Sequence, residues 1–318
     1  MNKVFIYILI LSNFNAFAQF SKAKGIYANK STTSIVSIGD TLYASGERQS
    51  IYMSFDGGLT WNNKLDTDAG VITVLSVKKD KIYAACKTNP RFRGNFTVVY
   101  IIKSASVIEK INQATPNFKY VRDVFILDDS ILLATEKGLF LNNTMQEIKL
   151  PKYDTFKNKG RYTKPSFGFI KACRDSFLLS STSSLVLLDS SLTHSKLLIN
   201  SKSIIYNSMF ADGTYRLNDA ICTGDSLLYT NEIGVFSYSF ESKKSKYISN
   251  MSANSQSKFI KLDNNIYLTT NKGLFSIYNT SNNINEGLPQ KGFMIYDFTL
   301  LSKRLVLSSN LGFYIHDL

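Results

Sequence analysis

The sequence predicts an all-β protein in which one unit of short antiparallel strands occurs seven times. Short apolar segments alternate with polar or Gly-containing turns along the chain, and the unit recurs at intervals of 39 to 50 residues. No segment sustains the 3.6-residue apolar period of a helix over ten residues. Four short strands and their turns fill such an interval, so the repeat is typical of a β-propeller, here with seven blades.

Each copy is an apolar strand, a tight polar turn, a second apolar strand ending in small residues, a turn with Gly in most copies, and a third strand. Turns such as Gly39-Asp40, Lys79-Asp80 and Gly224-Asp225 tolerate the sharp reversal between the first two strands. The first apolar residue after this turn marks each copy: Leu42, Ile82, Ile131, Phe177, Leu227, Ile266 and Leu305.

The two ends of the chain predict how the ring closes. The last copy stops after its third strand, whereas residues 25–28 precede the first copy and belong to no repeat. Pairing Gly25–Ala28 with Gly312–His316 would remove two exposed strand edges. We therefore expect the last blade to be closed by an N-terminal strand.

The first 18 residues resemble a secretory signal peptide. Lys3 precedes an apolar stretch from Val4 to Leu11, and Ala16-Phe17-Ala18 is a small-x-small cleavage site. An uncleaved anchor is the alternative, but the stretch is shorter than the ~20 residues that span a bilayer. We expect cleavage after Ala18, a single propeller domain over residues 19–318, and a secreted or periplasmic monomer without membrane insertion.

Composition leaves the partner open. The 37 Lys and Arg against 24 Asp and Glu give a net charge of +13, which favours anionic partners or a soluble basic surface. Export disfavours nucleic acid as the partner. Cys173 and Cys222 precede equivalent turns in neighbouring copies, so a disulfide is possible, although buried thiols are the favoured interpretation; Cys86 is the third cysteine.

One motif points to a family. Residues 54–61 read SFDGGLTW and match the Asp-box pattern S-x-D-x-G-x-T-W at Ser54, Asp56, Gly58, Thr60 and Trp61. The chain thus resembles the Asp-box, or BNR-repeat, propellers, a group that includes sialidases and sortilin-like receptors. The resemblance implies a structural turn between third and fourth strands, with Trp61 packed between blades.

The copies T-x-K-G-L-F at 135–140 and 270–275 also resemble the propeller repeats of bacterial two-component regulators. This resemblance implies a third interpretation, the detached sensor propeller of a signalling system.

The sequence gives less support to an enzymatic function. The sialidase resemblance would imply an arginine triad with a Tyr/Glu pair, but the Arg-Ile-Pro signature near the start is missing. His194 and His316 lie in no ligand-spaced cluster, and no phosphate-binding Gly loop or nucleophile elbow occurs. We expect no metal, no cofactor and no catalytic residue.

The long connections predict the binding face. Residues 87–96 expand a second-to-third connection, whereas 150–166 and 200–218 are blade-to-blade crossings, and in a propeller these two connection types share one face. Basic and aromatic residues alternate there and suit an anionic surface, unless the rings fold inward over a solvated loop face. The candidate ligand-binding residues are Arg91, Arg93, Lys152, Tyr153, Lys157, Lys159, Arg161, Tyr162, Lys164, Tyr215 and Arg216.

Fold, export and the lack of a catalytic set favour a non-catalytic binding or scaffold protein of the bacterial envelope, whose partner is an envelope protein or an anionic polysaccharide. A diverged, sialidase-like hydrolase or lyase is the alternative, because propellers carry many unrelated activities.

Overall fold

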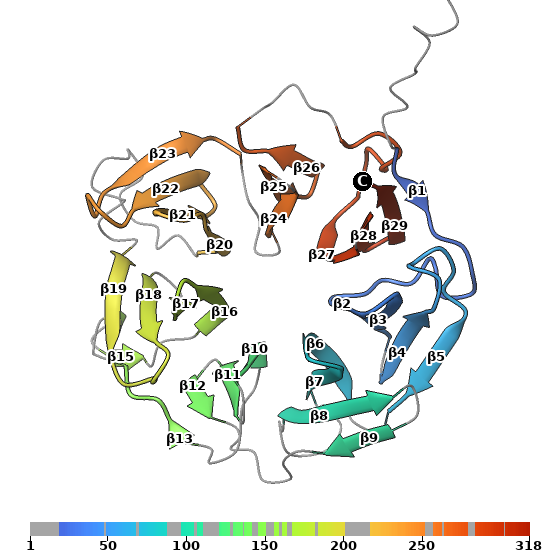
Figure 1. The fold of residues 1–318 in the computed structure, drawn as a ribbon, viewed down its shortest axis with the longest axis horizontal. Coiled ribbons are helices and arrows are strands. Elements are labelled where there is room, and N and C mark those ends of the chain that lie inside the picture. The colour runs from blue at the N-terminus through green and yellow to red at the C-terminus, as the bar shows by residue number, and fades with distance from the viewer. Residues whose placement is uncertain are drawn as a thin grey trace, which may run out of the picture.

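The chain forms a ring of antiparallel β-sheets around a central axis (Figure 1). This computed structural model describes residues 19–47, 49–67, 70–87, 97–104, 107–110, 121–127, 130–135, 137–141, 146–150, 156–158, 161–163, 167–181, 184–200, 217–251, 257–262, 264–278, 284–301 and 303–318. Six sheets of four strands and one of three strands make up the ring, and a two-stranded hairpin stands apart from them. The all-β propeller predicted from the repeat is confirmed.

We number the sheets of the ring in chain order. Sheet 1 contains β2 (Ile35–Ile38), β3 (Thr41–Ser45), β4 (Ser50–Ser54) and β5 (Asn63–Asp66). Sheet 2 contains β6 (Val71–Lys78), β7 (Lys81–Lys87), β8 (Thr97–Ser104) and β9 (Val107–Lys110). Sheet 3 contains β10 (Val121–Ile126), β11 (Ile131–Thr135), β12 (Gly138–Leu141) and β13 (Gln146–Glu147). Sheet 4 contains β16 (Phe167–Cys173), β17 (Ser176–Ser181), β18 (Ser184–Asp189) and β19 (Ser195–Asn200).

The other sheets complete the ring. Sheet 5 contains β20 (Asp219–Cys222), β21 (Ser226–Thr230), β22 (Val235–Ser239) and β23 (Ser245–Ser249). Sheet 6 contains β24 (Phe259–Leu262), β25 (Asn265–Thr270) and β26 (Gly273–Ser276). Sheet 7 contains β27 (Ile295–Leu301), β28 (Arg304–Ser309), β29 (Gly312–Asp317) and, from the other end of the chain, β1 (Ser21–Lys22). The hairpin pairs β14 (Phe156–Asn158) with β15 (Arg161–Thr163).

The prediction of seven four-stranded blades needs a correction at sheet 6. Among the described residues this sheet has three strands, so six complete four-stranded blades are present. The physical reason lies in Asn285, whose side-chain Oδ1 accepts the backbone N–H of Leu274 at 2.6 Å. Its Nδ2 donates to the carbonyl of Leu274 at 2.8 Å. One side-chain amide thus supplies to β26 both hydrogen bonds that a residue of a fourth strand would supply.

Three of the turns from second to third strand, in sheets 3, 6 and 7, share one hydrogen-bond pattern. The hydroxyl of Thr135 donates to the Gly138 carbonyl at 2.8 Å and accepts the N–H of Lys137 at 3.1 Å. Thr270 and Ser309 make the same pair of bonds in sheets 6 and 7. The glycines that close these turns have positive φ, which explains why Gly follows the small residue in these copies.

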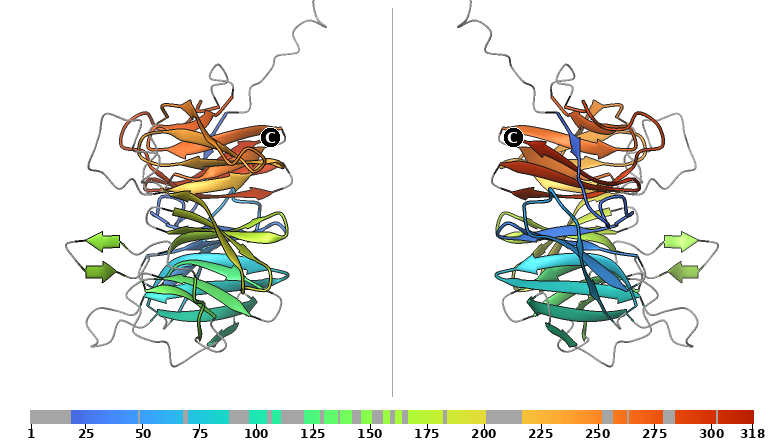
Figure 2. Two further views of the ribbon diagram at one scale, coloured as in Figure 1. Left: turned by 90° about the vertical axis from the view of Figure 1, so that its left-hand side faces the viewer. Right: turned by 90° about the vertical axis from the view of Figure 1, so that its right-hand side faces the viewer.

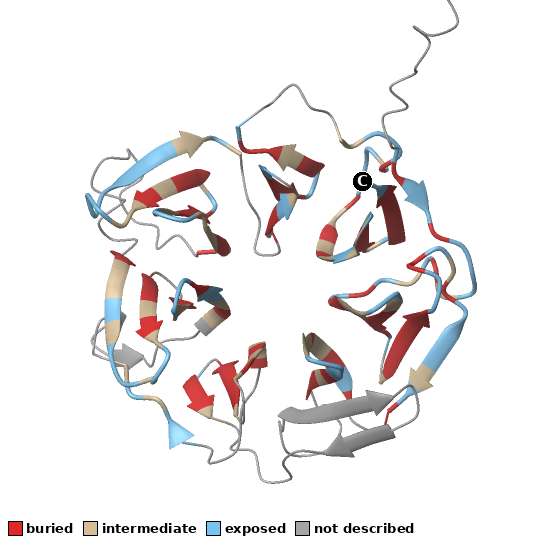
Figure 3. Ribbon diagram, in the orientation of Figure 1, coloured by how far each residue is buried: buried red, intermediate tan, exposed pale blue. Residues whose placement is uncertain are grey.

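The core is divided into clusters of buried apolar side chains between neighbouring sheets. Tyr43, Ile51 and Ile82 belong to the cluster between sheets 1 and 2, and Trp61 and Phe313 to the one between sheets 7 and 1. Burial is greatest on the second and third strands, such as β4 and β11, and the exposed residues lie mainly on the outer strands and turns (Figure 3). The second and third strands therefore have two buried faces, which is why they lack a polar side.

The ring is closed by an N-terminal strand, as expected, but with a different register. Ser21 pairs with Ile315 and Lys22 with Tyr314, so the pairing strand is β1 and not Gly25–Ala28. Residues 25–28 instead form a turn in which the Ala28 carbonyl accepts the N–H of Phe313 at 3.0 Å. The turn is required because the chain must leave sheet 7 and contact sheet 1, where the N–H of Tyr27 donates to the Trp61 carbonyl at 2.9 Å.

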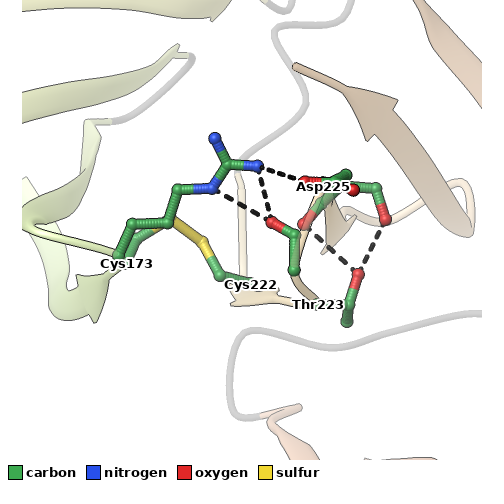
Figure 4. The surroundings of a disulfide bond; sticks show 7 residues. Cys173, Cys222, Thr223 and Asp225 are labelled. Carbon is green, nitrogen blue, oxygen red and sulfur yellow. Dashed lines mark hydrogen bonds and ion pairs between the residues drawn. A yellow bond between two sulfur atoms is a disulfide. The ribbon is translucent and has the colours of Figure 1, made fainter. Parts of the chain in front are cut away.

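A disulfide joins Cys173 at the end of β16 to Cys222 at the end of β20, with their Cα atoms 5.6 Å apart (Figure 4). The interpretation of both residues as buried thiols is therefore wrong. Next to this bond, the Arg174 guanidinium donates to the Gly224 carbonyl at 2.7 Å and pairs with Asp225 at 3.2 Å. The equivalent turns of sheets 4 and 5 are thus linked covalently and by charge.

The described part of the chain contains no helix long and apolar enough to cross a membrane.

Candidate functional site: the central cavity

The three long connections occupy the places in the element order that the sequence predicted. One lies between β7 and β8, one between β13 and β16, and one between β19 and β20. Most of the candidate ligand-binding residues lie outside the described residues: Arg91, Arg93, Lys152, Tyr153, Lys159, Lys164, Tyr215 and Arg216. The backbone of Lys157, Arg161 and Tyr162 is described, in the hairpin β14–β15.

The hairpin β14–β15 projects from one side of the disc (Figure 2). Lys157 pairs with Tyr162 and Asn158 with Arg161, and neither strand joins a sheet of the ring. The six residues of its strands are two basic, two aromatic and two polar, with no acidic residue. Two of the predicted basic residues, Lys157 and Arg161, thus belong to a hairpin outside the ring.

A cavity of about 590 Å³ lies on the ring axis between the first strands of the sheets. Its wall includes the residues at which the blade-to-blade crossings reach these strands, such as Ser34, Asn218 and Ser257. The hairpin belongs to one of those crossings. Cavity and hairpin therefore belong to the same side of the ring.

Bulges shape the cavity wall at four equivalent places. The pairing of first and second strands skips one residue in sheets 2, 3, 4 and 7, namely Thr73, Arg122, Gly168 and Tyr296. All four residues line the cavity. Because a bulge breaks the alternation of a strand, two consecutive side chains can contribute to one wall.

Three aspartates follow at equivalent positions of the first strands. Asp123, Asp219 and Asp297 each lie eight residues before the residue that marks their copy. Each carboxylate accepts a backbone N–H from the next sheet of the ring, from Ile170 at 2.9 Å, from Phe259 at 2.7 Å and from Ile35 at 3.0 Å. These carboxylates therefore connect neighbouring sheets as well as lining the cavity.

Two of these carboxylates pair with lysines. Lys171 Nζ lies 2.6 Å from Asp219 Oδ1, and Lys258 Nζ lies 2.6 Å from Asp297 Oδ1. Burial lowers the pKa of Lys258, but the charge and hydrogen bond of Asp297 raise it more, and the net pKa lies above the ordinary value. Lys258 is thus held as an ammonium group against Asp297.

The remaining two charges of the wall, Arg122 and Asp123, lack such a partner among the described residues. Asp123 accepts the N–H groups of Ile170 and Val124 and forms no ion pair there. Burial raises the pKa of Asp123 to about 6, against the lowering effect of these hydrogen bonds and of the nearby lysines. Arg122 Nε is buried and has no hydrogen-bond partner.

Sequence reasoning missed this cavity, although a signal was present. An aspartate in an apolar strand, at a constant distance from the repeat marker, costs free energy unless it has a partner. Three occurrences indicate a shared function in the ring. The bulges and the lysine partners depend on neighbouring sheets, so no spacing in the sequence identifies them.

The turn at Ser54–Trp61 forms a closed set of hydrogen bonds. Asp56 Oδ1 accepts the N–H of Thr60 at 2.9 Å and the hydroxyl of Ser54 at 2.8 Å, and Asp56 Oδ2 accepts the Thr60 hydroxyl at 2.7 Å. Burial raises the pKa of Asp56, but these bonds lower it more, to below its ordinary value. Trp61 is fully buried, stacks on Phe313 with ring centroids 3.7 Å apart, and donates Nε1–H to the Gly58 carbonyl at 2.9 Å.

A second turn of this kind, between β18 and β19, has no complete motif in the sequence. Asp189 Oδ1 accepts the N–H groups of Thr193 at 2.9 Å and His194 at 3.2 Å, as Asp56 does from Thr60. Burial raises the pKa of Asp189, yet the hydrogen bonds from His194, Ser191 and Thr193 bring it down to about 2. His194, which takes the place of the tryptophan, is exposed.

Within the described residues, no group of three or more His, Cys, Asp or Glu side chains is arranged to hold a metal ion.

Comparison with known proteins supports the fold. No family model and no curated protein matches the sequence. Among solved structures, the extracellular domain of a putative hybrid two-component system from B. thetaiotaomicron aligns with a TM-score of 0.67 and 14% identity, over 94% of this chain and 40% of that one. Virginiamycin B lyase from Staphylococcus aureus, a catalytically inactive variant with quinupristin, aligns with a TM-score of 0.65 and 13% identity, over 94% and 99% of the two chains. The Pan2 WD40 domain of Neurospora crassa gives 0.61 and 11%, over 94% and 95%.

Proposed function

We propose that this protein is an exported, non-catalytic binding propeller of the bacterial envelope. It recognises an anionic partner, an envelope protein or an acidic glycan, through the face of the blade-to-blade crossings. The observation that carries the proposal is the hairpin β14–β15, which stands outside the ring and whose strands contain two basic residues, Lys157 and Arg161, and two aromatic residues, Phe156 and Tyr162. Cations meet the charge of such a partner, and aromatic rings supply flat contact area.

Export rests on two further observations. The disulfide between Cys173 and Cys222 suits an oxidising compartment, since the cytosol keeps most thiols reduced. The first 18 residues have the order of a secretory signal peptide.

The test compares the parent protein with the double variant Lys157→Ser/Arg161→Ser by biolayer interferometry on immobilised polygalacturonate, chondroitin sulfate and a neutral glucan. We expect one acidic glycan to bind, with affinity falling as salt rises, because ions screen exposed charges over about 8 Å at 0.15 M. The variant should bind about tenfold more weakly, a change of about 1.4 kcal/mol.

Lys244→Ser/Lys246→Ser is the matched control, since both lysines are exposed at the outer edge of sheet 5 and their loss changes the net charge equally. Equal binding by both double variants and the parent would contradict a role for the hairpin. An acidic protein partner would be indicated if every glycan failed while an acidic envelope protein bound in the same salt-dependent way.

A sensor function is the second candidate. The likeness to the extracellular domain of a putative two-component system favours it, although the chain spans 40% of the length of that structure. Its test is a deletion strain assayed for a lost transcriptional response to the glycan that the interferometry identifies.

The alternative of a sialidase-like hydrolase requires a Tyr/Glu pair at the mouth of the cavity. The lining residues that the structure describes include Tyr296 and no glutamate. Turnover of a panel of labelled glycans would measure this activity directly.

A further inference from the structure

The central cavity has the size of a small-molecule site. Its volume of about 590 Å³ falls within the ~300–1,000 Å³ of ligand pockets in proteins, and the cavity lies on the axis of the ring. This site is separate from the hairpin, so the inference does not depend on the glycan-binding proposal.

Most charges of the wall neutralise one another. Lys171 with Asp219, and Lys258 with Asp297, form ion pairs of 2.6 Å. Asp297 also accepts the Ser34 hydroxyl at 3.1 Å and the N–H of Ile35 at 3.0 Å. These two pairs hold the first strands of neighbouring sheets together and leave little charge for a ligand.

One cation and one anion remain, and they are consecutive residues. Arg122 is the bulge residue of β10 and Asp123 follows it, and both line the cavity. They form no ion pair with each other, nor with another described residue. In a regular strand they would point to opposite faces, but the bulge brings both into one wall.

A third polar group of the wall also lacks a partner. The side-chain amide of Asn218, which precedes β20, has both its nitrogen and its oxygen buried without a hydrogen bond. Buried polar groups in this condition cost free energy that a bound polar molecule can recover.

We propose that the cavity binds a small zwitterion, a free amino acid or a short peptide, whose carboxylate pairs with Arg122 and whose ammonium group pairs with Asp123. A guanidinium can meet a carboxylate with two parallel hydrogen bonds, and a carboxylate accepts from an ammonium group. The ligand thereby satisfies both unpaired charges of the wall at once. An anion alone would leave Asp123 unpaired, and a cation alone would leave Arg122 unpaired.

Isothermal titration calorimetry at pH 7.5, where Asp123 is ionised, tests the proposal. The probes are the twenty amino acids and the peptides Gly-Gly and Gly-Gly-Gly, followed by the N-acetylated and the C-amidated form of the tightest one. We expect a zwitterion to bind and each blocked form to lose at least about thirtyfold in affinity, because each blocked form leaves one buried charge of the wall unpaired.

Variants assign each contact. Arg122→Gln should weaken the zwitterion strongly but leave the weak binding of the C-amidated form unchanged. Asp123→Asn keeps an oxygen that can accept the Ile170 N–H. This variant should also weaken the zwitterion strongly, but it should leave the weak binding of the N-acetylated form unchanged. Lys246→Gln is the control for Arg122→Gln, and Asp80→Asn is the control for Asp123→Asn. Each control changes the net charge as its counterpart does, but at an exposed position, and should bind the zwitterion as the parent does.

The proposal fails if no probe binds up to 10 mM, or if the blocked forms bind as well as the zwitterion. It also fails if Arg122→Gln and Asp123→Asn, folded as judged by circular dichroism, bind like the parent. None of these results bears on the hairpin, which Lys157→Ser/Arg161→Ser tests separately.

Discussion

Trp61 connects two neighbouring sheets with one side chain. It is fully buried, its ring stacks on Phe313 of sheet 7, and its Nε1–H bonds the Gly58 carbonyl within its own turn. Gly58 has a φ of +93°, so the turn needs glycine there as well as the tryptophan. The hydrogen bonds of Asp56 shape the turn, and the shaped turn places the indole at the junction.

Replacing Trp61 should destabilise the fold. We expect Trp61→Ala to lower the free energy of unfolding by about 3–5 kcal/mol, as for other large buried aromatic residues, and to leave ligand affinity unchanged. Trp61→Phe keeps a stacking ring and loses the Nε1 hydrogen bond, so its cost should be smaller by at least half. Urea unfolding measures both. Unchanged stability together with lost binding would assign Trp61 to a ligand site.

The raised pKa of Asp123 predicts that the stability of the fold depends on pH. This pKa is raised from the ordinary value of an aspartate to about 6, chiefly because burial disfavours the charged carboxylate, while Lys258 and Lys171 oppose the shift and Arg122 lies beside it. The native state therefore binds a proton that the unfolded state releases near pH 4. The resulting stabilisation is fully present below pH 4 and is lost as the pH rises through 6, in total about 3 kcal/mol.

The measurement is urea unfolding between pH 4 and 7.5 for the parent and for Asp123→Asn, which cannot titrate. The difference in stability between the two proteins should change in favour of the variant as the pH rises. A difference that stays constant over this range would mean that Asp123 titrates normally.

At the level of strands and turns, the sequence predicted most of what is local. The marker residue of every copy lies in the second strand of its own sheet, and the turns before the markers are those that join first and second strands. These features depend on apolar alternation and on turn residues within a few positions. The prediction of Gly25–Ala28 as the strand that pairs with β29 was wrong because Gly25–Ala28 and Ser21–Lys22 are both short segments that could pair there. Contacts with Trp61 and Phe313 decide between them.

The same distinction explains the missing strand of sheet 6 and the cavity. Asn285 replaces backbone by side chain, and the sequence pattern does not show which asparagine does so. The charges of the cavity pair across sheets, between residues 48 and 39 positions apart. Such pairs follow from ring geometry, whereas a repeat pattern describes one sheet at a time.

A substitution at Gly312 tests how the N-terminal segment closes the ring. A Cβ at this position would overlap the Ala28 carbonyl, which accepts the N–H of Phe313, and φ is +104°. We expect Gly312→Ala to lower the unfolding free energy by more than about 1–2 kcal/mol and to raise the hydrogen-exchange rate of residues 21–28.

Gly39→Ala is the matched control, because φ there is +55° and nothing lies within 4 Å of the added Cβ. It should cost only the backbone strain, about 1 kcal/mol. Equal losses in the two variants would mean that the N-terminal segment does not pack against β29 in solution. Deleting residues 19–30 should cost several kcal/mol, since it removes the β1–β29 pairing and exposes two edges.

At the level of the whole molecule, stability is distributed over the interfaces between sheets. A separate apolar cluster fills each interface, from sheets 1 and 2 round to sheets 7 and 1. The interface between sheets 4 and 5 is also joined by the disulfide, and Arg174 stacks there on Phe240 with 4.3 Å between guanidinium and ring. Loss of one interface therefore opens the ring without removing the others.

Removing the disulfide should lower the stability of the ring. The two cysteines are separated by 49 positions in the sequence, and a disulfide that closes a loop usually stabilises the folded state by about 2–4 kcal/mol. We expect reduction by dithiothreitol, or Cys173→Ser/Cys222→Ser, to lower the unfolding free energy by this amount. The variant should not respond to the reductant, and a parent melting curve that is unaffected by reductant would contradict the link.

The pairing of β1 with β29 also determines how the protein responds to mechanical force. The two strands are antiparallel, and Phe20 lies against His316, so both ends of the described chain leave the pair on the same side. Tension between the ends therefore peels the strands apart one hydrogen bond after another, instead of loading all of the bonds together in shear. A ring that is closed in this way resists thermal opening through its buried side chains, yet under a pull between its ends it yields first at the two residues of β1.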